Sequence, residues 1–166
     1  MDMDKTVAQV SEMEKFNARN MKGHVSIPDG VEIINQNTGF WYNKRIRSVY
    51  IPKSVRIIDT YAFQRCDNLT TVIFEEGLQR IESAAFWGCK SMSFLKFPAS
   101  LQFLGNDVFE DCISLQEVVI PANSKLPFIG LGVFNNCKNL RRIYLASFLS
   151  VFSSFPEGVE QVWHKE

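Results

Sequence analysis

Two consecutive stretches of the chain decide the fold: residues 69–91, LTTVIFEEGLQRIESAAFWGCKS, and residues 92–114, MSFLKFPASLQFLGNDVFEDCIS. When one is written above the other, apolar residues fall at the same places. Both contain Ala-Phe or Val-Phe, and Cys follows the Phe three residues later. Self-similarity at a short, fixed period is the signature of a repeat architecture.

The same unit continues on both sides of these stretches. Phenylalanine recurs with steps of 23, 23, 23 and 25 residues, at Phe40, Phe63, Phe86, Phe109 and Phe134. Cysteine follows the last four of these in the same register, at Cys66, Cys89, Cys112 and Cys137. A degenerate earlier copy runs through Val25 to Phe40, with Asn43 where cysteine would stand. The 14 phenylalanines of the chain thus reflect a repeated structural position.

Each unit is expected to begin with a short strand. Its first, fourth and sixth positions are apolar, a pattern that includes the period-2 alternation of a strand with one buried face. Proline follows directly in most units and ends the strand because it cannot donate to a ladder; Glu75 stands in its place in one unit. The later apolar positions are spaced by three or four, which predicts a turn of helix with one side facing inward. One unit buries too little alone, so neighbours must stack.

This unit, written L-x-x-V-x-I-P-x-x-L-x-x-I-x-x-x-A-F-x-x-C-x-N, resembles the BspA-like leucine-rich repeats over about residues 22–145. The resemblance implies an α/β fold, a right-handed leucine-rich-repeat solenoid with a parallel concave β-sheet and short helical turns on the convex side. It also implies a surface adhesion or protein-interaction role, because members of that family are mostly such modules and share no catalytic site. Glu75 and two extra residues near Ser124 depart from the pattern and are expected to change only local loops.

Both ends of the repeat array are expected to be capped, because an uncovered end exposes core. Residues 1–21 are predicted to form a capping helix, the alternative being a helix that docks on a partner. The helix is indicated by apolar residues at steps of three without intervening Gly or Pro: Val7, Val10, Met13 and Phe16. Residues 22–145 hold one degenerate copy, four regular copies and a final strand. Residues 146–166 lose the repeat pattern and are predicted to form a C-terminal cap.

The four cysteines are interpreted as a buried structural column. Neighbouring turns about 4.8 Å apart would not forbid a disulfide, yet each Cys occupies a core position defined by its Phe, where a free thiol behaves as a small apolar group. A zinc site needs converging Cys or His pairs, and the chain has only His24 and His164. A small polar residue two places after each Cys is assigned to holding the loop before the next strand: Asn68, Ser91, Ser114 and Asn139.

Several function classes find no support in the sequence. No nucleophile, metal or phosphate-loop motif is present, so we predict a protein that is not an enzyme and has no metal or cofactor. Lys+Arg and Asp+Glu balance at 18 each, which gives no field to recruit nucleic acid. No apolar run reaches the ~18–20 residues of a membrane span. The N-terminal residues lack a secretory signal, so the chain is expected to be cytoplasmic as written, or at the cell surface or secreted if it is part of a longer precursor.

The candidate binding residues are strand residues that must point away from the core, at the third and fifth positions of each unit. On a parallel sheet these positions form two adjacent columns on the concave face. The predicted partner-binding residues are Tyr50, Ile73, Phe94, Lys96, Val119, Arg142 and Tyr144. Aromatic residues and arginine are favoured at interface centres. The alternative is that strand propensity alone placed Tyr, Ile and Val there.

The sequence therefore predicts a module that binds a protein partner through the concave sheet face. Two alternatives remain open: a structural or self-associating fragment of a larger surface or adhesion array, and an intracellular inhibitor or immunity-type protein. Carbohydrate is a less favoured partner, although exposed aromatic rings also stack on sugars. Trp41 and Trp87, each directly after a repeat Phe, are interpreted as partial core, with a second contact surface as the alternative.

Overall fold

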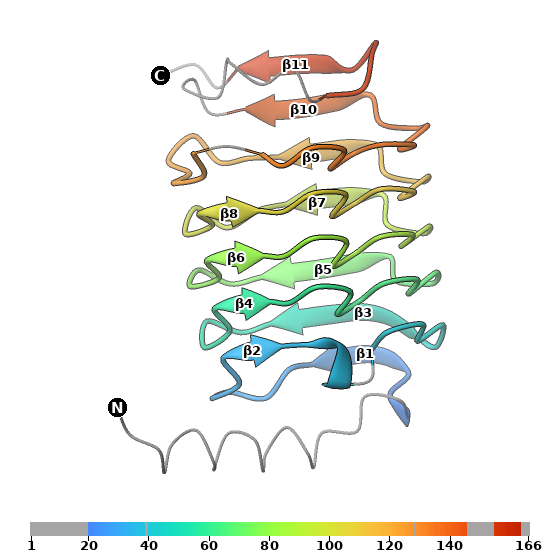
Figure 1. Ribbon diagram of the computed structural model, residues 1–166, viewed down its shortest axis with the longest axis vertical. Helices are drawn as coiled ribbons and strands as arrows, with labels where there is room; N and C mark the ends of the chain where they lie inside the picture. The colour runs from blue at the N-terminus through green and yellow to red at the C-terminus, as the bar shows by residue number, and fades with distance from the viewer. Residues whose placement is uncertain (1–19, 39, 128, 146–154, 164–166) are drawn as a thin grey trace.

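The structure is a computed structural model that describes residues 20–38, 40–127, 129–145 and 155–163 of the chain. Short strands stack turn upon turn into a parallel-sheet solenoid of about five turns (Figure 1). Nearly all of the predicted N-terminal helix lies outside the described residues. Of the predicted C-terminal cap, only residues 155–163 are described.

A long parallel sheet runs along the solenoid, and it has two parts. The first part contains β1 (Gly23–Ser26), β3 (Ile46–Ile51) and β5 (Thr71–Phe74), and the second contains β7 (Phe94–Lys96), β9 (Glu117–Val119), β10 (Arg142–Leu145) and β11 (Glu160–Trp163). Strand pairing keeps the repeat register, since Val49 pairs with Val72 and Leu95 with Val118. Strands β5 and β7 lie side by side but are not paired with each other, so the hydrogen-bonded ladder of the long sheet is interrupted at the middle of the solenoid.

A second parallel sheet of two-residue strands lines another side of the solenoid. Its strands are β2 (Ile33–Ile34), β4 (Ile57–Ile58), β6 (Arg80–Ile81) and β8 (Phe103–Leu104). An isolated bridge between Leu104 and Ile129 continues it by one turn. These strands run opposite to those of the long sheet (Figure 1). The second residue of each is fully buried: Ile34, Ile58, Ile81 and Leu104.

The prediction of short helical turns on the convex side is wrong for the described residues, whose only named helix is the 3₁₀ turn η2 (Gln36–Thr38). The backbone instead takes a left-handed conformation two residues before and two residues after each of the last four repeat phenylalanines, and two residues after Phe40. Tyr61 and Arg65, with φ of 61° and 57°, flank Phe63 in this way. Left-handed residues placed at this short interval prevent a continuous helix. The amides of Phe63 and Arg65 donate instead to Ala85 O and Trp87 O of the next turn, both at 2.8 Å. Bonds between turns thus replace the i→i−4 bonds of a helix.

The repeat phenylalanines stack into a column through the core. Successive ring centroids are 4.7, 5.0, 5.3 and 6.0 Å apart, for the rings of Phe40, Phe63, Phe86, Phe109 and Phe134. All five side chains are fully buried. These separations lie in the range in which aromatic pairs attract beyond simple area burial. Phe155 continues the column 6.3 Å from Phe134, so part of the C-terminal segment packs on the last repeat.

The cysteines form a second buried column of free thiols, as the spacing predicted. Each thiol donates to the carbonyl oxygen of the repeat Phe one turn earlier. The sulfur–oxygen distances are 3.0, 3.2, 3.4 and 3.1 Å for Cys66, Cys89, Cys112 and Cys137. The column therefore links successive turns by hydrogen bonds as well as by packing.

Burial is expected to make these thiols resistant to modification. It raises the pKa of Cys66 and of Cys137 to about 12, and raises the pKa of Cys89 and Cys112 well above the ordinary thiol value. Since the thiolate is the reactive species, we expect an aromatic disulfide reagent at about pH 8 to leave the native protein unlabelled. The same reagent should modify all four thiols after unfolding in denaturant. Rapid labelling of any thiol in the folded protein would contradict the buried column.

Loops are held as predicted by three of the small polar residues after the cysteines, Asn68, Ser91 and Asn139, but the bonds run across turns. Asn68 Nδ2 donates to Lys44 O at 2.7 Å, in the loop that enters the strand of the preceding turn. The side chains of Ser91 and Asn139 reach back in the same way, at 2.6 and 2.7 Å. These bonds fix the point at which each turn enters the long sheet.

Candidate binding surface

We call one surface the open face. It is the side of the long sheet that points away from the core, and it carries the third and fifth residues of each repeat. The structure places every predicted binding residue on it: Tyr50, Ile73, Phe94, Lys96, Val119, Arg142 and Tyr144. Strand register sets Tyr50 opposite Ile73, and Val119 opposite both Lys96 and Tyr144. These residues thus share one surface.

Two large apolar side chains occupy the middle of the open face. Ile73 on β5 is 53% exposed, and Phe94 on β7 is 49% exposed. They lie across the interruption between the two parts of the sheet, where β5 and β7 are neighbours. Scattered apolar residues on a surface are ordinary, but large exposed ones on neighbouring strands of one face are typical of interaction sites.

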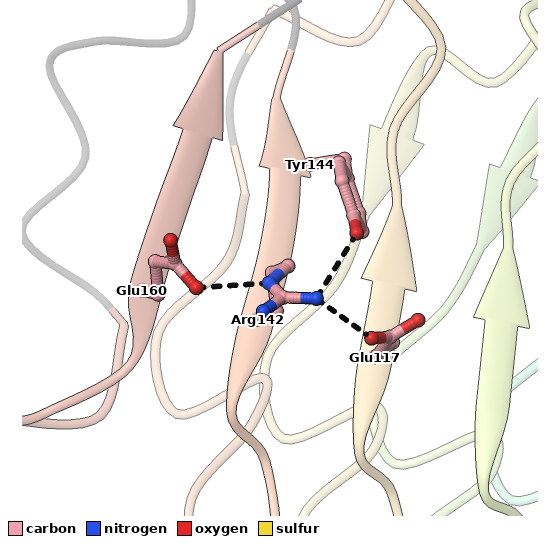
Figure 2. A network of polar contacts seen from close by, with 4 residues as sticks. All are labelled: Glu117, Arg142, Tyr144 and Glu160. Carbon is pink, nitrogen blue, oxygen red and sulfur yellow. Dashed lines mark hydrogen bonds and ion pairs between the residues drawn. The ribbon is translucent and has the colours of Figure 1, made fainter.

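The C-terminal end of the open face is held together by Arg142, which bonds across three strands (Figure 2). Its Nε lies 2.8 Å from Glu160 Oε2, and its Nη1 lies 3.2 Å from Glu117 Oε1 and 3.4 Å from the hydroxyl oxygen of Tyr144. Such exposed ion pairs add little to stability, because water and salt screen the charges. Arg142 therefore already has two carboxylate partners, and it orders this end of the face.

Sequence reasoning missed these partners of Arg142. Glu117 occupies the same third-position column, so the repeat register alone was sufficient to find it. Glu160 lies after the last recognisable repeat, in β11, which pairs with β10 without sharing the repeat sequence. Only the fold brings that carboxylate to Arg142.

The N-terminal end of the open face is organised by hydroxyl groups and one carboxylate. His24 Nδ1 lies 2.6 Å from Ser48 Oγ. The hydroxyl of Tyr50 donates to the carboxylate of Glu75. This bond raises the pKa of Tyr50 and lowers the pKa of Glu75, which also accepts from the amide of Lys53. Glu75 thus joins the open face to the turn that follows the preceding strand.

Glu75 and Glu76 explain the missing proline of this repeat. The amide of Glu75 donates to Ile51 O at 3.0 Å, a bond that proline cannot make. Its Oε2 accepts the amide of Lys53 at 3.0 Å. The carboxylate of Glu76 accepts the amides of Ala99 and Ser100, both at 2.9 Å. The two glutamates therefore tie this turn to the turns on either side.

An open depression of about 420 Å³ lies beside Tyr50, where the first strands of the long sheet end. Its polar lining comes from Ser26, Asp29, Tyr50, Lys53 and Glu75. Its apolar lining comes from Ile27, Pro28 and Pro52. Because Ser26 and Tyr50 belong to the fifth-position column, the depression is continuous with the open face.

The interpretation of the two repeat tryptophans as partial core is wrong for Trp41, which is 51% exposed. Its indole Nε1 donates to Gln64 Oε1 at 2.6 Å, and the polar glutamine leaves much of the ring uncovered. Trp87 is half-buried, because the guanidinium of Arg65 lies over its ring at 5.4 Å. The two tryptophans differ in exposure because Gln64 neighbours Trp41, whereas the longer Arg65 covers Trp87.

The part of the chain that the structure describes bears on metal binding and on membrane insertion. Within it, no group of three or more His, Cys, Asp or Glu side chains is placed to hold a metal ion. None of its helices has the length and apolar character needed to cross a membrane.

Comparison with solved structures supports the fold. A leucine-rich-repeat protein of T. pallidum superposes with a TM-score of 0.72 and is 31% identical, with 84% of this chain and 68% of that chain covered. The pneumococcal vaccine antigen PcpA is 18% identical at a TM-score of 0.71, and a leucine-rich-repeat protein of Bacteroides ovatus is 21% identical at 0.68. The alignments cover 90% and 88% of this chain but only 38% and 43% of those two, whose likeness shows the fold alone.

No curated protein sequence resembles this chain closely enough to count as a match. The model of the BspA type leucine rich repeat region matches residues 32–155 in six copies, most of the chain. Proteins with these repeats are generally interaction or surface-repeat proteins. The chain belongs to the BspA type leucine-rich-repeat family.

Proposed function

We propose that this chain is a protein–protein interaction module that binds a macromolecular partner through its open face and catalyses no reaction. The observation that carries this proposal is the exposed pair Ile73 and Phe94 at the middle of that face. Fully burying a side chain of this size contributes about 1.5–3 kcal/mol, so covering the exposed half of each contributes about 1 kcal/mol. An apolar centre of this kind is what protein interfaces bury.

The surroundings of the pair support the same proposal. Lys96 and Thr71 stand next to it on the same face and are exposed, while Tyr50 and Tyr144 are partly exposed. Interfaces typically combine an apolar centre with a polar rim, and tyrosine is enriched at their energetically dominant positions. The hydrogen bonds of both tyrosines hold their rings in place before a partner arrives, which reduces the entropy lost on binding.

Photo-cross-linking tests this proposal. A benzophenone amino acid in place of Phe94, in cells of the source organism, is expected to give one adduct of defined mass, identified by mass spectrometry. The matched control carries the same group at Leu131, which is 72% exposed on another side of the solenoid. Equal adducts from both positions, or none from position 94, would contradict the proposal. An adduct with a second copy of this chain would favour self-association.

The affinity of the captured partner gives the second readout. The double variant Ile73→Ser/Phe94→Ser should weaken binding at least tenfold, because truncating two central apolar contacts removes about 1.4 kcal/mol or more. Leu131→Ser should leave the dissociation constant unchanged. Wild-type affinity in the double variant would move the binding site away from the open face.

A further inference from the structure

We infer that the depression beside Tyr50 is a subsite for one cationic side chain, a lysine or arginine, of the protein partner. This inference rests on the proposed function and extends it to the chemistry of the partner. The partner segment then presents a large apolar side chain to Ile73 and Phe94, and a basic side chain to the carboxylates of Asp29 and Glu75.

The charge of the depression favours a cation. Its lining carries two carboxylates, Asp29 and Glu75, and one ammonium group, Lys53, so one negative charge is in excess. The whole chain, by contrast, has no net charge. Two hydrogen bonds keep Glu75 ionised, from the Tyr50 hydroxyl and from the Lys53 amide. A carboxylate offers about four acceptor sites, so Glu75 still has sites for an incoming N–H donor.

The shape of the depression suits a long side chain with a charged end. Pro28, Pro52 and the ring of Tyr50 supply apolar walls. Lysine and arginine lay their aliphatic stems along such surfaces while the charged group reaches polar atoms. A cation over the face of a tyrosine ring gains a further attraction. The hydroxyl of Ser26 and the carboxylates of Asp29 and Glu75 are the acceptors for the charged group.

The position of the depression ties it to the apolar centre. Glu75 follows Ile73 by two residues, so strand geometry sends both side chains to the same face about 7 Å apart. Tyr50 pairs with Ile73 across β3 and β5 and also lines the depression. An extended partner segment meets both places when its apolar and basic residues are two positions apart.

The repeat sequence explains why such a site occurs at this place. Glu75 occupies the position at which the neighbouring units carry Pro52 and Pro98, and Asp29 belongs to the degenerate first copy. Glu75 thus departs from the regular unit, whereas Asp29 fills the variable position after Pro28, as Lys53 does after Pro52. In the units with proline this position carries no charge, whereas in this unit it carries the carboxylate of Glu75.

A titration of the labelled full chain with Nα-acetyl-arginine amide, followed by ¹H–¹⁵N NMR, tests the subsite without any knowledge of the partner. We expect saturable shifts at the amides of Ser26, Tyr50, Lys53 and Glu75. The neutral analogue Nα-acetyl-norleucine amide and the anionic Nα-acetyl-glutamate amide should bind at least several-fold more weakly. No saturable shift, or equal shifts with the anionic probe, would overturn the inference.

Three variants make the test specific to these charges. Asp29→Asn/Glu75→Gln keeps oxygen acceptors for the existing hydrogen bonds but removes both charges, and should weaken binding about fivefold. Lys53→Met removes the competing cation and should strengthen binding about twofold. Glu76→Gln makes the same change one residue away, at a carboxylate that faces Ala99 and Ser100, and should have no effect. An unchanged dissociation constant in the double charge variant would overturn the inference.

The captured partner separates this inference from the proposed function. Both are supported if Ile73→Ser/Phe94→Ser and Asp29→Asn/Glu75→Gln each weaken partner binding. Loss in the apolar variant alone would leave the open face as the binding site and remove the cationic subsite. Loss in the charge variant alone would keep the subsite and remove the apolar centre.

Discussion

Replacing Phe86 by alanine is expected to lower the free energy of unfolding by about 3–5 kcal/mol, the usual effect of deleting a buried ring. Phe86 is fully buried at the middle of the phenylalanine column. Its ring centroid lies 5.0 Å from Phe63 and 5.3 Å from Phe109, and Phe74 meets it edge-on at 6.1 Å. The substitution therefore leaves a cavity that three aromatic rings line. In a solenoid each turn is stabilised only by its neighbours, so this cavity weakens the contact between the two halves.

The matched control is Phe94→Ala, which deletes the same ring from the open face. Phe94 is about half exposed, so its loss should change stability by less than about 1 kcal/mol. Urea unfolding followed by circular dichroism measures both variants. Similar losses of stability in the two would contradict the assignment of one phenylalanine to the core and the other to a binding surface.

Replacing Gly130 by alanine is the second substitution with a large expected effect. A Cβ at this position would lie 2.4 Å from Gly105 O, 2.5 Å from Gly105 C and 2.8 Å from Asn106 N. All three atoms are backbone, so no side chain can move aside, and the two turns must separate. Overpacking of this kind lowers the free energy of unfolding by about 1–3 kcal/mol. We expect Gly130→Ala to lie at the upper end of this range, because two stacked turns must shift.

Gly30→Ala separates steric overlap from backbone strain. Gly30 has a φ of 91°, which disfavours alanine, but no heavy atom beyond its own residue and its two chain neighbours lies within 4 Å of a Cβ built there. The free energy of unfolding of Gly30→Ala should fall only by the backbone strain energy, about 1 kcal/mol. Thermal unfolding of both variants gives the comparison. A smaller loss for Gly130→Ala than for Gly30→Ala would contradict the close approach of the turns at Gly105.

The sequence predicted the features that repeat. Phe and Cys in register identified the two buried columns, and period-2 alternation identified which strand residues face outward, because both patterns follow from stacking identical turns. The helical turns were predicted wrongly because a spacing of three or four marks any tight turn that returns a side chain to the core. The left-handed residues that unwind it include Tyr61, Arg65 and Ala84, whose residue types do not indicate that conformation.

The features of the site that do not repeat could not be predicted in the same way. Glu160 reaches Arg142 only because β11 adds to the sheet without the repeat sequence. Glu75 was visible as a missing proline, but its contacts with Tyr50 and Lys53 depend on the distance between turns. The depression beside Tyr50 depends on the position of Glu75, on the distance between turns, and on Asp29 in the degenerate copy.

Methyl cross-saturation from the captured partner tests most directly the claim that the open face is the binding surface. With only the methyl groups of this chain protonated, irradiation of the partner should attenuate the signals of Ile73 and Val119, which point outward from the long sheet. Ile33 and Leu131, which are also exposed but lie on other sides, should keep full intensity. Attenuation at Ile33 or Leu131, with Ile73 unaffected, would contradict the proposal.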